Sequence, residues 1–175
     1  TILHVAGTYF IFLINSVYVN SNCRKQQPAE NNQYDMVDDL IEHGADLKCF
    51  DRDNRNVLHI AAQDGSFRVV EVLIRRGADV NAVDKFNYTP LFAAVDEHPD
   101  LANVLIQNGA DVNAMDLVKK TALHLAAECG QVDVAKVLIQ NGADVNAVDK
   151  NKRTTLHRAA WKGMLDCGLY SNPSP

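Results

Sequence analysis

Residues 121–153 read TALHLAAECGQVDVAKVLIQNGADVNAVDKNKR, and the opening of this stretch returns 33 positions after Thr121, at Thr154. The same opening occurs upstream at Asn56 and, in altered form, at Thr89. The tripeptide Gly-Ala-Asp recurs at matching intervals, starting at Gly44, Gly77, Gly109 and Gly142. A period of 32 to 33 residues predicts a repeat architecture, in which one supersecondary unit is stacked several times.

Each unit carries the signals of two short helices. Thr121 stands where an N-cap residue belongs, and Gly130 and Gly142 follow the two apolar segments as helix ends. Apolar residues recur with helical spacing, namely Leu123, Ala126 and Ala127 in the first segment and Val134, Val137 and Leu138 in the second. Helices shorter than about 12 residues are marginal alone, so these units have to stack on one another.

The pattern T-x-L-H-x-A-A, followed by a glycine, an apolar V-x-x-V-L-I run and G-A-D-V-N-A-x-D, resembles the ankyrin repeat family. It covers most of the chain from Asn32 to Gly163, together with Thr1 to Ala6. The resemblance implies an all-α solenoid of stacked helix-turn-helix pairs with β-hairpin-like tips. Such an array binds a protein partner through its tips and the exposed side of its first helices.

A histidine recurs in phase at His59, His124 and His157. The resemblance implies that these side chains make hydrogen bonds within and between repeats, which we prefer to a catalytic role. Phe92 takes the place of this histidine in the third repeat, and we expect packing to replace the missing link there.

Residues 7–28 interrupt the first repeat. Deleting them joins Ala6 to Ala29 and brings Ala29-Glu30 into phase with Ala127-Glu128, near the end of a first helix. We interpret the segment as a retained intron translated in frame, in a chain that is a fragment or an incomplete gene model because it starts at Thr1. A transmembrane span or a signal peptide fits less well, since the apolar stretch is short and no basic region precedes it.

The remaining irregularities lie in the third repeat and at the C-terminus. The third repeat lacks the glycine between its helices, and we expect Pro99 to start its second helix after a tightened turn. The fifth repeat supplies one helix ending at Gly163 and then loses the apolar pattern. We therefore predict an array over residues 1–163, of about four to five repeats with the insertion at 7–28, and an irregular tail over 164–175.

Composition narrows the function classes. The net charge of −5 argues against nucleic acid as the main partner. The four cysteines, Cys23, Cys49, Cys129 and Cys167, are scattered, which indicates reduced thiols rather than disulfides or a zinc site. We expect an intracellular, cytoplasmic protein with no metal, cofactor, small-molecule substrate or membrane span.

No catalytic or nucleotide-binding motif occurs in the sequence, so we do not expect an enzyme. The predicted function is a protein–protein interaction scaffold or adaptor. Its tips are rich in basic and apolar residues, and we expect them to lie beside an acidic wall formed by first-helix residues such as Glu128. The residues predicted to bind the partner are Phe86, Tyr88, Leu117, Val118, Lys119, Lys120, Lys150, Lys152, Arg153 and Trp161.

Two alternatives stay open. Members of the family are substrates of an asparaginyl hydroxylase that favours a leucine eight residues before the asparagine. This spacing occurs at Asn81, Asn113 and Asn146, which follow Leu73, Leu105 and Leu138. The chain can also be the adaptor region of a larger enzyme, channel or toxin.

Overall fold

A computed structural model describes residues 28–95 and 98–166, with side chains described over 34–95 and 98–163. The helices are α2 (Pro28–Glu42), α3 (Val57–Asp64), α4 (Phe67–Arg75), α5 (Pro90–Ala93), α6 (Pro99–Gln107), α7 (Ala122–Cys129), α8 (Val132–Gln140) and α9 (Thr155–Asp166). Within these ranges extended pairing is limited to one antiparallel bridge, between Val148 and Thr154. The predicted all-α solenoid with hairpin-like tips is confirmed.

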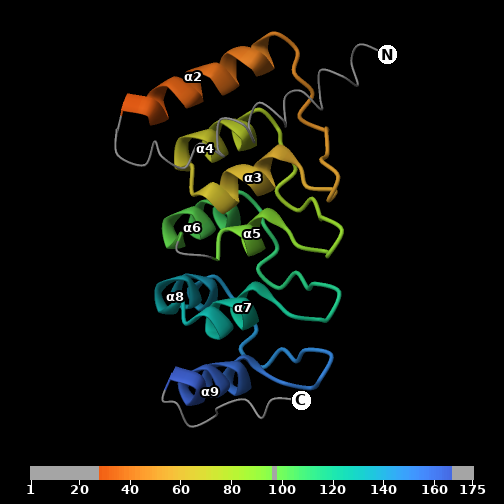
Figure 1. The fold of residues 1–175 in the computed structure, drawn as a ribbon, viewed down its shortest axis with the longest axis vertical. Coiled ribbons are helices and arrows are strands. Elements are labelled where there is room, and N and C mark those ends of the chain that lie inside the picture. Colours follow the sequence, from red (N-terminus) through yellow and green to blue (C-terminus); the bar gives the residue numbers. More distant parts are fainter. Residues whose placement is uncertain (1–27, 96–97, 167–175) are drawn as a thin grey trace.

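The helices form two layers along one axis, with α2 and α9 at opposite ends of the stack (Figure 1). In one layer α3 packs on α5, α5 on α7 and α7 on α9, and in the other α2 packs on α4 and α6 on α8. The long loops between successive helix pairs all project to the same side of the stack (Figure 1). Over the residues that the structure describes, each repeat therefore packs on its neighbours along the stack, as the periodicity predicts.

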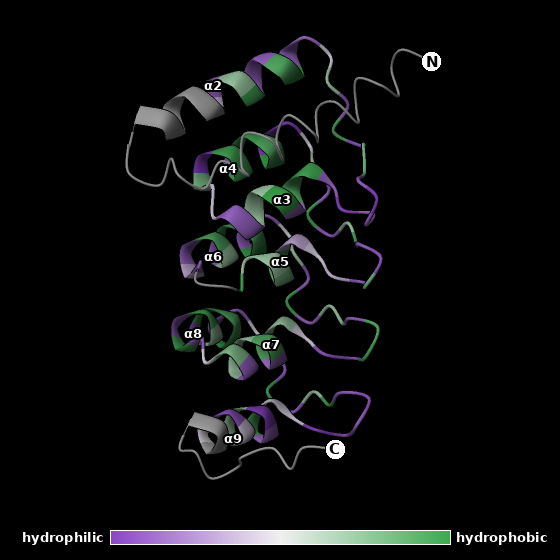
Figure 2. Cartoon of the chain, viewed as in Figure 1, coloured by the Kyte–Doolittle hydropathy of each residue, from purple (hydrophilic) through white to green (hydrophobic). Residues whose placement is uncertain are grey.

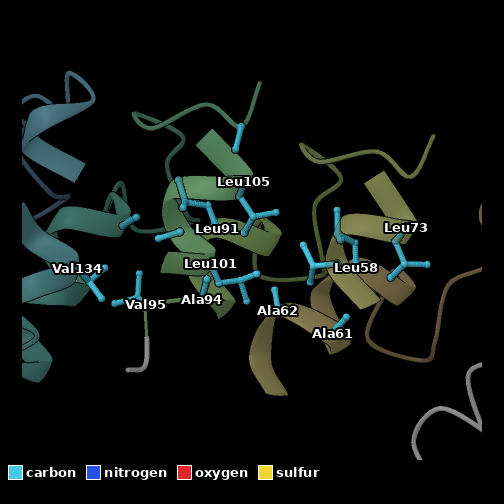
Figure 3. Close-up of a cluster of buried hydrophobic side chains, with 14 of the residues drawn as sticks. Leu58, Ala61, Ala62, Leu73, Leu91, Ala94, Val95, Leu101, Leu105 and Val134 are labelled. Atoms are coloured by element: carbon cyan, nitrogen blue, oxygen red, sulfur yellow. The ribbon is translucent and has the colours of Figure 1, made fainter. Parts of the chain in front are cut away.

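The core repeats with the sequence. Leu58, Leu91 and Leu123 occupy the same position of the first helices and are at most 1% exposed. The second helices contribute their own phased leucines, and small residues such as Ala61 and Ala94 let adjacent helices approach closely (Figure 3). Each leucine buried in this way contributes roughly 1.5–3 kcal/mol, which offsets the low stability of helices this short.

The first repeat differs from the prediction. The alignment placed Ala29-Glu30 in a first helix that ends near Asn32, but α2 runs without interruption from Pro28 to Glu42. Pro28 begins this helix, where a missing N–H costs nothing. No glycine follows until Gly44, so no residue favours the left-handed conformation that would separate two helices. The predicted insertion lies outside the described residues except for Pro28.

The third repeat keeps its second helix and shortens its first. Helix α5 has 4 residues, against 8 in both α3 and α7. Pro99 is the first residue of α6, as predicted, and α6 has the same 9-residue length as α4 and α8. Helix α6 is preceded by His98, whose ring lies against Gly65 of the second repeat, and a Cβ at Gly65 would come within 2.3 Å of that ring. The histidine occupies space that only a glycine leaves open.

The C-terminal helix is longer than predicted. Helix α9 continues through Gly163 to Asp166, past the predicted end of the helix at Gly163. Gly130, at the equivalent position, ends α7 with a φ of 76°, whereas Gly163 stays helical. Leu156 on this helix is 76% exposed, whereas Leu123 at the equivalent position of α7 is 1% exposed.

The described part of the chain contains no helix long and apolar enough to cross a membrane. Two of the four cysteines fall in this part: Cys49 is a free thiol, and Cys129 is exposed. Cys49 is half-buried against the core.

Candidate functional site

The four loops that project from the stack are built in the same way. Each begins with an aspartate whose carboxylate accepts hydrogen bonds from the backbone N–H groups two and four residues on. At Asp116 these distances are 2.8 Å to Val118 and 2.7 Å to Lys120. Equivalent bonds occur at Asp51, Asp84 and Asp149. We call these loops the tips: residues 51–55, 84–88, 116–120 and 149–153.

The fourth residue of every tip has a left-handed backbone. Asn54 and Asn87 have φ of 61° and 64°, and Lys119 and Lys152 both have φ of 60°. Asparagine tolerates this conformation well, but lysine is uncommon there and costs about 1 kcal/mol or more. The two C-terminal tips therefore carry backbone strain that the two N-terminal tips avoid.

The asparagines also join successive repeats. The Asn54 side-chain amide donates to the carbonyl oxygen of Val83 at 2.8 Å, and that of Asn87 donates to Met115 at 2.6 Å. Lysine has no such short amide, and among the described residues neither Lys119 nor Lys152 makes an equivalent bond. The C-terminal tips thus lose a side-chain link in addition to being strained.

Backbone hydrogen bonds fix each tip against the next. The N–H of Lys85 donates to Asp53, that of Leu117 to Phe86, and that of Lys150 to Val118, over 2.9, 3.2 and 2.9 Å. The tips consequently form one continuous edge with side chains at defined positions. Such an edge is preorganised for recognition, because little backbone freedom is left to lose on binding.

Charge divides this edge into two halves. Tips 51–55 and 84–88 each have a net charge of zero, while tips 116–120 and 149–153 have +1 and +2. Lys85 pairs with Asp53 at 2.6 Å and Arg55 with Asp51 at 2.8 Å, so the N-terminal tips neutralise much of their own charge. The pKa of Asp53 is lowered chiefly by the hydrogen bond from Lys85.

The C-terminal tips leave most of their cations uncompensated. Across residues 34–95 and 98–163, no carboxylate pairs with the exposed side chains Lys119, Lys150, Lys152 and Arg153. These four cations therefore present their charge to solvent.

Apolar side chains lie among these cations. Leu117 is 66% exposed, Val118 is 42% exposed and Phe86 on the preceding tip is 51% exposed. Figure 2 shows hydrophobic residues at the turn of the loop between α6 and α7, where the loop before α9 is hydrophilic. We call the combined set the tip surface: Phe86, Leu117, Val118, Lys119, Lys150 and Lys152.

The structure separates three of the predicted binding residues from the tip surface. Tyr88 is half-buried and stacks on the Phe92 ring with centroids 5.0 Å apart. Lys120 donates to Glu128 at 2.8 Å. Trp161 is 53% exposed but lies on α9, away from the tip turns. Arg153 is exposed at the end of its tip, and its carbonyl oxygen accepts from His124.

A partly buried arginine on α9, Arg158, alters the predicted acidic wall. Arg158 donates to Glu128 at 3.0 Å and to the almost completely buried carboxylate of Asp149. Glu128 therefore pairs with Arg158 and Lys120 and offers no free charge, while Asp96 and Glu97 lie outside the described residues. Burial alone would raise the pKa of Asp149, but the amide of Arg153 and the Arg158 guanidinium lower it to about 2. The sequence signal for these ion pairs was Arg158 itself, because the second and fourth repeats have the apolar residues Ile60 and Leu125 at the same position.

Sequence reasoning also missed a column of exposed apolar residues. The residue directly before each tip aspartate is large and apolar in all four cases, and each is 38–47% exposed. These residues are Phe50, Val83, Met115 and Val148. The available signal was their recurrence at the repeat period of 32 to 33 residues.

The phased histidines are structural, as the resemblance implied. The backbone N–H of Thr121 donates to Nδ1 of His124 at 3.2 Å, and Nε2 of His124 donates to the carbonyl of Arg153 at 3.1 Å. His59 makes the same two links, to Asn56 and Tyr88. These bonds cap the first helix and fasten it to the next tip.

Phe92 cannot make these bonds. Its ring stacks on Tyr88, which confirms that packing replaces the link. The hydroxyl of Thr89, the N-cap of α5, is buried without a hydrogen-bond partner among the described residues. The substitution therefore leaves a polar group unsatisfied.

The three candidate asparagines differ in their contacts. Asn81 donates to Gly109 and accepts from Asp111, and Asn113 likewise bonds Gly142 and Asp144 of the following repeat. Asn146 is exposed. Its backbone N–H donates to the Asp144 carboxylate at 2.9 Å, and its side chain has no hydrogen-bond partner among the described residues.

Comparison with known proteins agrees with this geometry. A family model described as ankyrin repeats in three copies matches residues 26–116 and 98–170. No curated protein sequence matches the chain. The family match spans well over half of the chain and coincides with the helix pairs and tips described above. The chain therefore belongs to the ankyrin repeat family.

Proposed function

We propose that this protein is a protein–protein interaction scaffold that holds a partner on the tip surface. Ankyrin repeats in general bind proteins and are typically not catalytic. One observation carries the proposal for this chain: Leu117 and Val118 are 66% and 42% exposed at turn positions where polar residues are expected. Interface energy concentrates in such side chains when a rigid backbone presents them.

The test replaces both residues with aspartate. Leu117→Asp with Val118→Asp should abolish capture of partners from an extract of the source organism while the helical circular dichroism spectrum stays unchanged. A matched control is Val132→Asp with Ile139→Asp, since these residues are 63% and 50% exposed on α8. Equal losses in both variants, or capture that survives in the first, would show that the tips are not the site.

A second candidate function is modification of the asparagines by a hydroxylase. Support comes from Asn146, whose side chain is exposed and is not bonded to a described residue of a following repeat, unlike Asn81 and Asn113. Leu138, eight residues upstream, is completely buried, so modification requires local opening of the repeat. We expect one added oxygen on the Asn146 peptide first, measured by mass spectrometry after incubation with an asparaginyl hydroxylase. Faster modification of Asn81 would contradict this order.

The proposal also covers the location of the protein and its possible place in a larger chain. The free thiol of Cys49 fits a reducing, intracellular location. The tip surface would serve equally well as the adaptor region of a larger enzyme, channel or toxin.

A further inference from the structure

We propose that the tip surface binds an acidic segment of a protein that also carries apolar side chains, in an extended conformation that runs along the two C-terminal tips and ends at Phe86 on the preceding tip. This inference rests on the proposed scaffold function and adds the chemistry of the partner. The inference rests on the difference in charge and backbone strain between the two N-terminal tips and the two C-terminal tips.

Charge is the first observation. The two C-terminal tips together have a net charge of +3 in a chain of net charge −5, and the two N-terminal tips have zero. Lys119, Lys150 and Lys152 have no carboxylate paired with them in the described part of the chain. Uncompensated cations on an otherwise acidic protein attract an acidic partner and select against basic ones.

Backbone strain is the second, independent observation. Lys119 and Lys152 adopt φ of 60° at the position where Asn54 and Asn87 stand in the other tips. Asparagine would relieve the strain, and at Lys119 it would reach the equivalent carbonyl, that of Val148. Folding therefore does not explain the lysines, and strained residues of this kind concentrate at functional sites.

Geometry is the third. Backbone hydrogen bonds join Leu117 to Phe86 of the preceding tip and Val118 to Lys150 of the following tip. Leu117 and Val118 therefore lie between Phe86 and Lys150. Adjacent helices pack roughly 10 Å apart, and an extended chain advances about 3.3 Å per residue. About every third residue of a bound extended segment therefore reaches the next tip. The segment's apolar side chains would contact Leu117, and its acidic side chains would contact the lysines.

A nucleic acid fits the same surface less well. The centre of the surface is formed by Leu117 and Val118, which cannot stack on bases as aromatic rings do. A net charge of +3 over two tips also covers few phosphates, and the rest of the chain is acidic.

The experiment measures fluorescence anisotropy with a labelled peptide that repeats Glu-Glu-Leu. Comparison probes are peptides that repeat Lys-Lys-Leu or Glu-Glu-Ser, a single-stranded oligothymidylate, and phosphatidylserine vesicles. We expect binding of the Glu-Glu-Leu peptide alone, weakened by added salt because exposed charges are screened. Equal or tighter binding of the oligothymidylate, the vesicles or the Lys-Lys-Leu peptide would overturn the proposal.

Variants test the residues without relying on a loss of fold. Lys119→Asn with Lys152→Asn should weaken the peptide about tenfold, since each exposed pair contributes at most about fivefold. The same variant should be more stable than the parent, so unfolding cannot account for the loss. Lys150→Glu should weaken binding further, whereas Arg52→Glu, at the equivalent position of the first tip, should leave it unchanged. Unchanged binding in the lysine variants, or equal losses in the Lys150 and Arg52 variants, would overturn the proposal.

The outcome for the scaffold itself is separate. If the Glu-Glu-Leu peptide does not bind but Leu117→Asp with Val118→Asp still abolishes partner capture, the scaffold stands and the acidic partner is wrong. If neither result is obtained, both proposals fall.

Discussion

The third and fourth repeats follow the same sequence pattern, but the third has its defect in the first helix and the fourth has its defect in the tip. In the third, the tip is well satisfied through Asn87, while the first helix has 4 residues and a buried unbonded hydroxyl on Thr89. In the fourth, the first helix has 8 residues and a complete capping box between Thr121 and His124, while the tip strains Lys119.

The difference shows what a stacked array tolerates. A weak first helix in the third repeat is supported from both sides, because α3 and α7 each pack on α5. The strained tip of the fourth repeat has no comparable structural compensation, since lysine there gives up a bond to the next repeat. A defect that neighbours absorb needs no functional explanation, but one that is left uncompensated on the surface does.

The strongest way to break the comparison is to exchange the histidine and the phenylalanine. His124→Phe should lower the free energy of unfolding by about 3 kcal/mol, because it removes bonds to Thr121 and Arg153 inside the structure. Phe92→His should change it by less than about 1 kcal/mol, since the new cap offsets the lost ring stacking. Urea unfolding followed by circular dichroism measures both, and similar losses would show that the two first helices are equivalent.

Exchanging the left-handed residues tests the tips. Asn87→Lys should cost about 2 kcal/mol, from backbone strain and the lost bond to Met115. Lys119→Asn should gain about 1 kcal/mol, since asparagine tolerates φ near 60°. The same unfolding assay applies. A loss of stability in Lys119→Asn would mean that the lysine is required by the fold, and the argument from strain would fail.

The two N-cap threonines give a smaller contrast. Thr121→Val should cost about 1 kcal/mol, because Oγ1 of Thr121 accepts from the His124 amide and donates to Nδ1 of its ring. Thr89→Val should be neutral or slightly stabilising, since its buried hydroxyl has no partner among the described residues. Hydrogen exchange of the helix that follows each residue reports the effect locally. A clear loss at Thr89 would reveal a partner for its hydroxyl.

The smallest expected effect is a pH dependence that the third repeat lacks. Burial lowers the pKa of His59 below its ordinary value of 6.5, so protonation favours the unfolded state. This histidine's contribution is complete above pH 6.5 and declines as the pH falls from there toward the lower pKa of the folded state. Hydrogen exchange of α3, corrected for intrinsic rates, should therefore accelerate between about pH 7 and about pH 5.5.

The control for this effect is the variant His59→Gln, in which the acceleration in α3 should disappear. Helix α5, with Phe92 in place of the histidine, should not show it in either protein. Persistence of the acceleration in the variant would assign the titration to another group.

Much of the fold followed from the sequence because each repeat signal acts locally. Thr121, Gly130 and Pro99 begin or end their helices as predicted, since an N-cap, a left-handed glycine and a first-position proline need only their own backbone. The prediction failed where a signal was absent. Without a glycine near Asn32, α2 continues as one helix, and Gly163 does not end α9.

The candidate site was predicted only in part. Phe86, Leu117, Val118 and the exposed lysines were identifiable as unusual tip residues. The sequence did not distinguish Tyr88 and Lys120 from these residues. Tyr88 stacks on Phe92 and Lys120 pairs with Glu128, and both contacts depend on how separate elements pack. Local composition does not show which charges are already neutralised.

The sequence by itself determined the period, the helix pairs, the tips and the family, since these depend on spacing and on short-range hydrogen bonds. Only the tertiary structure decided which tip cations are paired, which carboxylates Arg158 pairs with and which positions share one exposed edge. The physical reason is that both charge compensation and burial depend on distances between residues about 30 positions apart in the chain, which stacking alone sets.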